Sequence, residues 1–184
     1  AYSGVTQMSS DPEAALDKRV SLARQYMGVG DWENAKRNLE LAREVDPNNA
    51  EVFEAFAQVY QSTGEFEMEE NQFRAALKAE PSLSRAHNNF AAFLYSQGRY
   101  TEAELESNSV TEHTLYSGRP MAFVNLGLCR PQREDNAGAE AAFTLALSMD
   151  RRNPVALLET VFLRLEAGDT DEAARSHISP VSYT

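Results

Sequence analysis

The sequence has little of what would indicate a disulfide framework, a membrane span or a disordered chain. Of its 184 residues only Cys129 is a cysteine, which excludes an internal disulfide and a cysteine-based zinc cluster. No apolar run is long enough to span a bilayer, and no signal peptide is visible. Seven prolines are too few for a Pro-rich chain. The length suits one domain with a sizeable core, or about five units of a helical repeat.

Basic residues are also scarce. The sequence has 17 lysines and arginines and 28 acidic residues, which gives a net charge of −11. The basic stripe that neutralises phosphates is missing, so nucleic acid is not expected as a partner. The simplest interpretation of the acidity is solubility.

The residue patterns of catalysis are absent too. The histidines His87, His113 and His177 lack the spacing of metal ligands, and there is no glycine-rich phosphate loop, nucleophile elbow or HExxH motif. No histidine is placed to activate Cys129, which is expected to be a small buried residue. We therefore expect no enzyme, no metal site and no cofactor.

A 34-residue period runs through the chain instead. From Ser84 to Glu104 the apolar spacing predicts a helix, a break at Gly98-Arg99 and the start of a second helix. Three kinds of marker recur at this period: the glycines Gly30, Gly64 and Gly98, the aromatic residues Trp32, Phe66 and Tyr100, and the prolines Pro47 and Pro81. Agreement of three markers indicates an array of helical hairpins.

The pattern resembles the tetratricopeptide repeat. A large–small pair marks the first helix of four units: Leu22-Ala23, Phe56-Ala57, Phe90-Ala91 and Leu126-Gly127. A close-packing alanine marks the second helix: Ala35, Ala103, Ala139 and Ala173. Glu69 departs from this rule, so looser packing is expected there. The resemblance implies an all-α fold, a right-handed superhelix of about five helix–turn–helix units with a concave inner face.

The predicted organisation is a flexible leader over residues 1–10, a repeat domain over 11–177 and an irregular tail over 178–184. The units are expected at about 14–47, 48–81, 82–117, 118–152 and 153–177. The fourth follows a two-residue insertion near Leu115–Arg119, and Pro131 should end its first helix early. The fifth is expected to turn at Gly168-Asp169 and to begin its second helix at Ala173, without a capping helix.

By helical phase, the first helix of each middle unit should line the inner face. The candidate partner groove then consists of Glu51, Glu54, Gln58, Arg85, Asn88, Tyr95, Met121, Val124 and Leu128. Its charge grades from acidic to mixed to apolar, which would suit a peptide of some basic character. Two alternatives stay open: the acids are merely solvated, or irregular packing near the insertion buries the apolar residues.

Some sequence motifs are more specific than the general repeat pattern. Asn88-Asn89-Phe90 with Phe93-Leu94-Tyr95 and Gly98-Arg99-Tyr100 resembles the third unit of the PilW/PilF-type pilotins, lipoproteins of type IV pilus biogenesis. Thr114-Leu115-Tyr116, the insertion and Asn125-Leu126-Gly127-Leu128-Cys129 are similar to the family as well. The likeness extends from about Ala14 to Arg175.

This resemblance implies a non-enzymatic protein on the periplasmic face of the Gram-negative outer membrane, which binds the pilus secretin and assists its localisation or assembly. The lipid of such proteins sits on an N-terminal cysteine, and the leader AYSGVTQMSS would fit the tether after it. Two other functions are alternatives: a peptide-binding adaptor or co-chaperone in the cytoplasm, and a structural subunit that stacks head-to-tail through its uncapped fifth unit.

Overall fold

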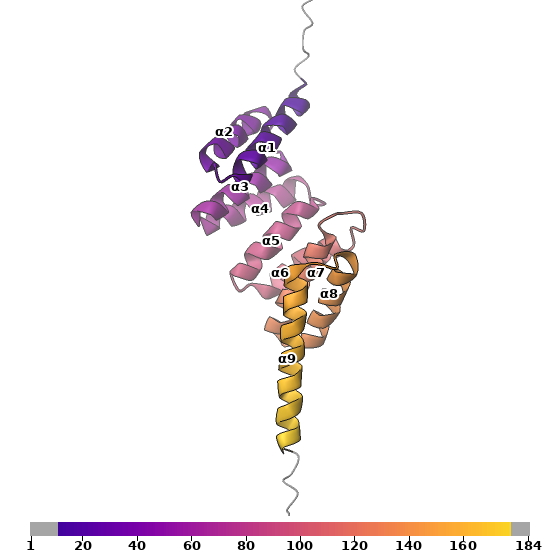
Figure 1. Cartoon of the computed structure of the whole chain (residues 1–184). Coiled ribbons are helices and arrows are strands. Elements are labelled where there is room, and N and C mark those ends of the chain that lie inside the picture. The colour runs from indigo at the N-terminus through magenta and orange to yellow at the C-terminus, as the bar shows by residue number, and fades with distance from the viewer. Residues whose placement is uncertain (1–10, 178–184) are drawn as a thin grey trace, which may run out of the picture. The chain divides into compact units, whose positions relative to one another are not determined.

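A computed structural model describes residues 11–177, and the side chains of residues 11–169. The predicted leader and tail lie outside the described residues. Within the described part all regular structure is helical (Figure 1), as the sequence predicted. The α-helices are α1 (Pro12–Gly28), α2 (Trp32–Val45), α3 (Ala50–Thr63), α4 (Phe66–Ala79), α5 (Ser84–Ser96), α6 (Tyr100–Thr111), α7 (Arg119–Cys129), α8 (Asn136–Met149) and α9 (Pro154–His177).

The chain divides into two compact units, Ala1–Ala86 and His87–Thr184. In the first, α1 packs on α2 and α3 packs on α4. In the second, α7 packs on α6, α8 and α9. The boundaries of the five predicted repeats stay a prediction. No helix of the described residues is both long enough and apolar enough to cross a bilayer.

Each unit has its own apolar core. The first core gathers side chains of α1, α2 and α3 around Phe56, with Trp32 and Tyr60 at its edge. The second gathers side chains of α7, α8 and α9 around Phe143. Small residues line both, and Gly127 is needed in the second because a Cβ there would collide with the Phe143 ring. Apolar burial of this kind is the main stabilising contribution to each unit.

Left-handed residues close the turns between paired helices. Gly30, Gly64 and Gly98 have φ of 77°, 71° and 74°, a region that glycine enters without steric cost. In the fourth hairpin Glu134 takes this conformation at φ 62°. Side-chain caps begin several helices; the Asn49 side chain, for example, accepts a hydrogen bond from Val52 N at 3.1 Å.

Pro131 shortens α7 as predicted, because proline cannot donate the next helical hydrogen bond. The helix has 11 residues against 14 in α3, and a 3-10 turn, Pro131–Arg133, follows it. Two arginines fasten this turn: Arg133 pairs with Glu104, and Arg130 Nη1 donates to the Gly138 carbonyl oxygen at 2.8 Å.

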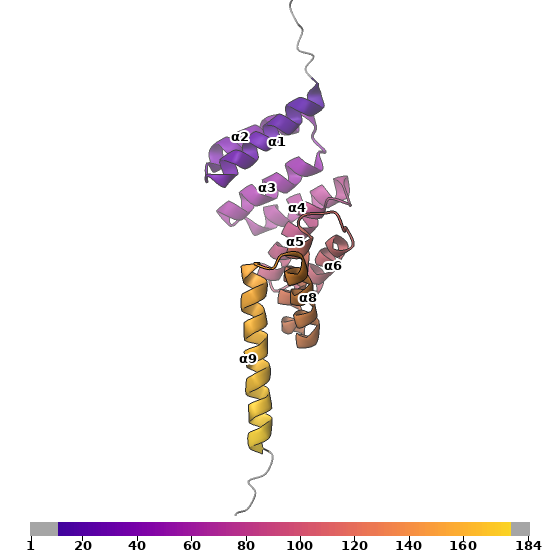
Figure 2. The ribbon, with the colours of Figure 1, turned by 45° about the vertical axis from the view of Figure 1, so that its right-hand side comes forward.

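The prediction of a turn at Gly168-Asp169 is wrong. The helix α9 is continuous from Pro154 to His177, and its last turns extend beyond the α7–α8 hairpin of the same unit (Figure 2). Glycine inside a helix costs only about 1 kcal/mol. The neighbouring Glu166, Ala167 and Glu172 are good helix formers, and no proline interrupts the segment. Ala173 therefore continues a helix rather than starting one.

Glu69 is the one acidic residue at a position where the repeat favours alanine. Its side chain is 1% exposed, and its Oε2 atom has no hydrogen-bond partner. Burial raises the pKa of this carboxyl from 4.5 to about 7. The fold therefore favours the protonated acid.

Replacing Glu69 by Gln should remove a pH dependence of stability. Because the folded pKa lies above the unfolded one, the folded state holds the extra proton, and stability falls as pH rises from about 4.5 to about 7. The full loss is about 3 kcal/mol. Urea unfolding near pH 5 and near pH 8 measures it. The Glu67→Gln variant, at an exposed position of the same helix, is the control. Equal pH dependence in both variants would contradict the assignment.

Candidate partner-binding surface

In the first unit, the predicted acidic groove residues belong to an ion-pair network. Arg24 of α1 lies with its Nη2 atom 2.9 Å from Glu51 Oε2 and 2.7 Å from Glu54 Oε2. Gln58 Nε2 donates to the other oxygen of Glu54. Arg85 Nη1 lies 3.2 Å from Glu51 Oε2. The charge of both acids is therefore matched from within the protein.

This network corrects the prediction for Glu54. Its side chain is fully buried, so it cannot contact a partner. Glu51 and Gln58 are half-buried and Arg85 is exposed, and their role in a groove stays a prediction. The sequence pattern missed the network because Arg24 comes from the preceding repeat. A buried carboxylate needs such a partner, since an unpaired charge is costly to bury.

Asn88 does not point into a groove either. It is 5% exposed, and its Nδ2 atom donates to the Gly118 carbonyl oxygen at 2.9 Å. Asn125 Nδ2 donates in turn to the Asn88 carbonyl oxygen at 3.5 Å. Asn88 thus ties Gly118, the residue that precedes α7, to α5. Helical phase does not register this hydrogen bond, because its acceptor lies about 30 residues further along the chain.

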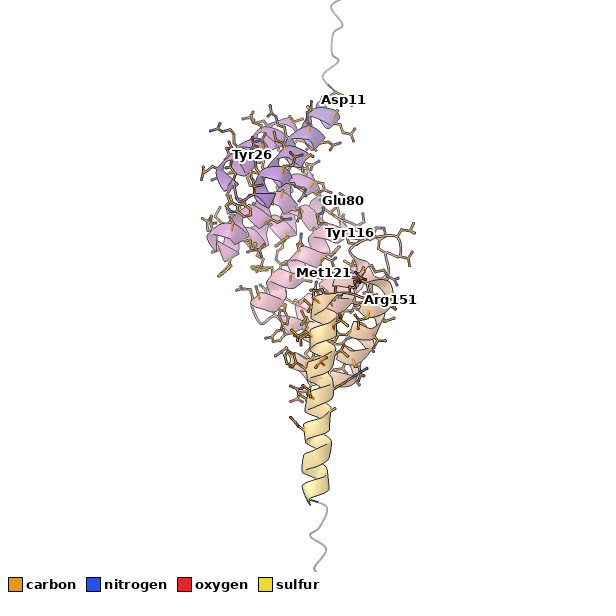
Figure 3. The ribbon with its side chains drawn as sticks, viewed as in Figure 1. Asp11, Tyr26, Glu80, Tyr116, Met121 and Arg151 are labelled. Atoms are coloured by element: carbon orange, nitrogen blue, oxygen red, sulfur yellow. The ribbon has the colours of Figure 1, made fainter. Side chains whose placement is uncertain are left out.

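The apolar candidates of α7 divide between core and surface. Val124 is 2% exposed and belongs to the second core, against which the half-buried Leu128 also packs. The alternative of burial near the insertion therefore holds for these two residues, and Val124 is not a groove contact. Met121, labelled in Figure 3, is 51% exposed.

Tyr95 keeps a half-buried position. Its ring contacts that of Tyr100, with centroids 5.5 Å apart. Burial raises the pKa of Tyr95, and Tyr100, Cys129 and Glu159 add to the rise. Its phenol stays neutral at physiological pH and can donate a hydrogen bond.

Cys129 is buried, and burial, reinforced by Glu104, raises its pKa to about 11. The thiol is thus protonated and a poor nucleophile at neutral pH. Among the described residues no group of three or more His, Cys, Asp or Glu side chains could hold a metal ion.

The structure also exposes an apolar surface on α9, in the unit that the sequence suggested only as a face for stacking of copies. One face of α9 carries half-exposed large side chains at Leu157, Leu158, Val161, Phe162 and Leu165. The signal was present in the sequence, since apolar residues fall on both faces of this segment. The segment was predicted to be the first helix of an uncapped fifth hairpin, whose second helix, beginning at Ala173, would have covered part of this face.

Comparison with known proteins now identifies the class. A tetratricopeptide-repeat family profile matches residues 50–83, which cover α3 and α4. The described helices and this match define a tetratricopeptide-repeat protein and confirm the predicted fold class.

Two relatives indicate a more specific family within this class. The type IV pilus assembly protein PilF of Pseudomonas aeruginosa is 35% identical over 147 residues, which cover 80% of this chain and 58% of PilF. The solved structure of Pseudomonas aeruginosa PilF superposes with a TM-score of 0.83 at 32% identity, over 89% of this chain and 74% of that one. The structure of PilW, a widely conserved type IV pilus biogenesis factor, gives 0.77 at 25% identity, over 83% and 70%.

The chain belongs to the tetratricopeptide-repeat family of type IV pilus biogenesis proteins that includes PilF and PilW. The predicted resemblance is thereby confirmed. The chain spans 58% of the length of the PilF sequence that it matches.

Removing the Arg24 guanidinium should destabilise the first unit strongly. Arg24→Met leaves Glu54 buried without its cation, at a cost of about 3 kcal/mol. The second change Glu54→Gln should recover much of this loss. Arg74→Met is the matched control, because Arg74 pairs with Glu70 at the surface, where a pair contributes at most about 1 kcal/mol. Urea unfolding measures all four proteins. Equal losses in Arg24→Met and the control would show that the pair is not structural.

Proposed function

We propose that this protein is a non-enzymatic adaptor of the type IV pilus system, a pilotin that binds the pilus secretin and assists its localisation or assembly in the outer membrane. It would act on the periplasmic face of that membrane, held by an N-terminal lipid. The observation that carries the proposal is the relationship to PilF and PilW over most of the chain.

The side-chain chemistry supports an adaptor. The only cysteine is buried and its pKa is raised to about 11. Of the buried acids, Glu54 belongs to an ion-pair network, and burial raises the pKa of Glu69 to about 7. The described surface includes exposed apolar side chains, among them Met121 of α7 and a row along one face of α9. Exposed apolar area of this extent is typical of protein–protein contacts.

The proposal predicts that the chain, expressed behind a lipoprotein signal, restores secretin multimers and surface pili to a Gram-negative strain lacking its PilF-type protein. Affinity capture from the envelope of that strain should recover the secretin. A soluble version without the signal is the control for lipid anchoring. Capture of cytoplasmic proteins, with no secretin and no restoration, would instead favour the cytoplasmic adaptor.

The exposed face of α9 favours one second candidate, a structural subunit that stacks on its own copies. Light scattering across a concentration series distinguishes the two. A mass that stays that of one chain removes the stacking subunit, whereas growth with concentration supports it over the pilotin.

A further inference from the structure

The helix α9 is apolar on two opposite sides. On one side Ala156 is fully buried and Leu163 packs against the second core. On the other side five side chains, which we call the α9 stripe, are between 46% and 59% exposed: Leu157, Leu158, Val161, Phe162 and Leu165. Their spacing places them along one continuous face over more than two helical turns. A helix that is apolar all round is ordinarily covered on both sides.

The register of the repeat identifies what covers this face elsewhere. Both α3 and α9 begin after an asparagine cap: Asn49 Oδ1 accepts from Val52 N, and Asn153 Oδ1 accepts from Ala156 N at 3.0 Å. Aligning these caps pairs Val161 with Ala57, which is fully buried in the unit where α3 packs on α4. The stripe therefore includes the side of α9 on which a second hairpin helix would lie.

The same alignment places apolar residues where α3 is polar. Leu158 takes the position of Glu54, and Phe162 takes that of Gln58. In α3 these positions are occupied by the network with Arg24. In α9 the positions expected on the inner face and the positions that would face a second hairpin helix form one continuous apolar surface. An amphipathic helix is the ligand that buries such a surface while keeping its own polar side in water.

The charged residues beside the stripe indicate which charge the ligand should carry. By helical periodicity, Glu159, Glu166 and Asp169 lie along the edge next to Phe162. Arg164 lies at the opposite edge, with its Nε atom 4.0 Å from Glu140 Oε1. The chain as a whole carries a net charge of −11. A basic residue at the rim of the ligand would therefore be attracted.

We propose that the α9 stripe is a docking site for an amphipathic helix of another protein, with an apolar face and basic residues at its edge. This inference rests on the proposed adaptor function, and it names the chemistry of the partner segment. A second copy of this chain that docks stripe to stripe fits less well. Two α9 helices packed antiparallel about a twofold axis would bring their acidic edges together.

The test uses the whole chain and two synthetic helical peptides of the same apolar pattern, one carrying lysine and one carrying glutamate at the polar positions. Fluorescence anisotropy of the labelled peptides measures binding. The variants are Phe162→Asp, which places a charge in the stripe, and Leu105→Asp, which places one at an exposed leucine of α6. Phe162→Leu is the conservative change. Circular dichroism verifies that each variant is folded.

The lysine peptide should bind the unmodified chain, the Leu105→Asp variant and the Phe162→Leu variant alike. Phe162→Asp should weaken it at least about tenfold, the glutamate peptide should bind far more weakly, and added salt should reduce the preference for lysine.

Four results would overturn the proposal. Equal binding to the Phe162→Asp and Leu105→Asp variants would place the site elsewhere, and absence of binding would show that the stripe is closed to a partner, as when the same chain covers it. Self-association lost in Phe162→Asp would assign the stripe to a second copy. Secretin capture that persists in Phe162→Asp would leave the adaptor function standing and reject only the docking site.

Discussion

The close approach of paired helices is the constraint on which both units depend. It requires side chains without bulk where two helices meet, and Ala35, Ala103 and Ala139 are fully buried at such positions. Gly127 shows the same requirement more sharply, because a single added carbon would meet the Phe143 ring. Interiors packed to this density accept few changes of volume. Because this constraint recurs in every hairpin, it produces the 34-residue period, and the repeat can therefore be recognised from the sequence alone.

The two buried acids, Glu54 and Glu69, are the second determinant, and the fold accommodates them in opposite ways. Glu54 pairs with Arg24 of the preceding hairpin, so it links α1 to α3. Glu69 has no cation beside it, and burial raises its pKa to about 7. The first acid gains a partner and the second holds a proton. Glu54 is therefore not available to a ligand, so the inner face of α3 is less acidic than its composition indicates.

Features set by local sequence could be predicted, and features set by contacts between distant residues could not. The helices, the glycine turns and the early end of α7 at Pro131 follow from short-range rules. The candidate site was predicted from helical phase, which shows on which face of a helix a residue lies but not whether another segment buries it. The pairing of Arg24 with Glu54 and of Asn88 with the Gly118 carbonyl depends on neighbours about 30 residues away. The wrong prediction of a turn in α9 has a different cause. A glycine alone does not end a helix where the neighbouring residues favour it.

The account divides the inner positions of the repeats into a polar, internally paired set on α3 and an apolar, open set on α9. Hydrogen exchange of the chain, alone and with the purified periplasmic part of a type IV pilus secretin, tests this division most directly. The account predicts that the secretin slows amide exchange along α9 and leaves α3 unchanged. Slower exchange along α1 and α3, with α9 unaffected, would contradict it.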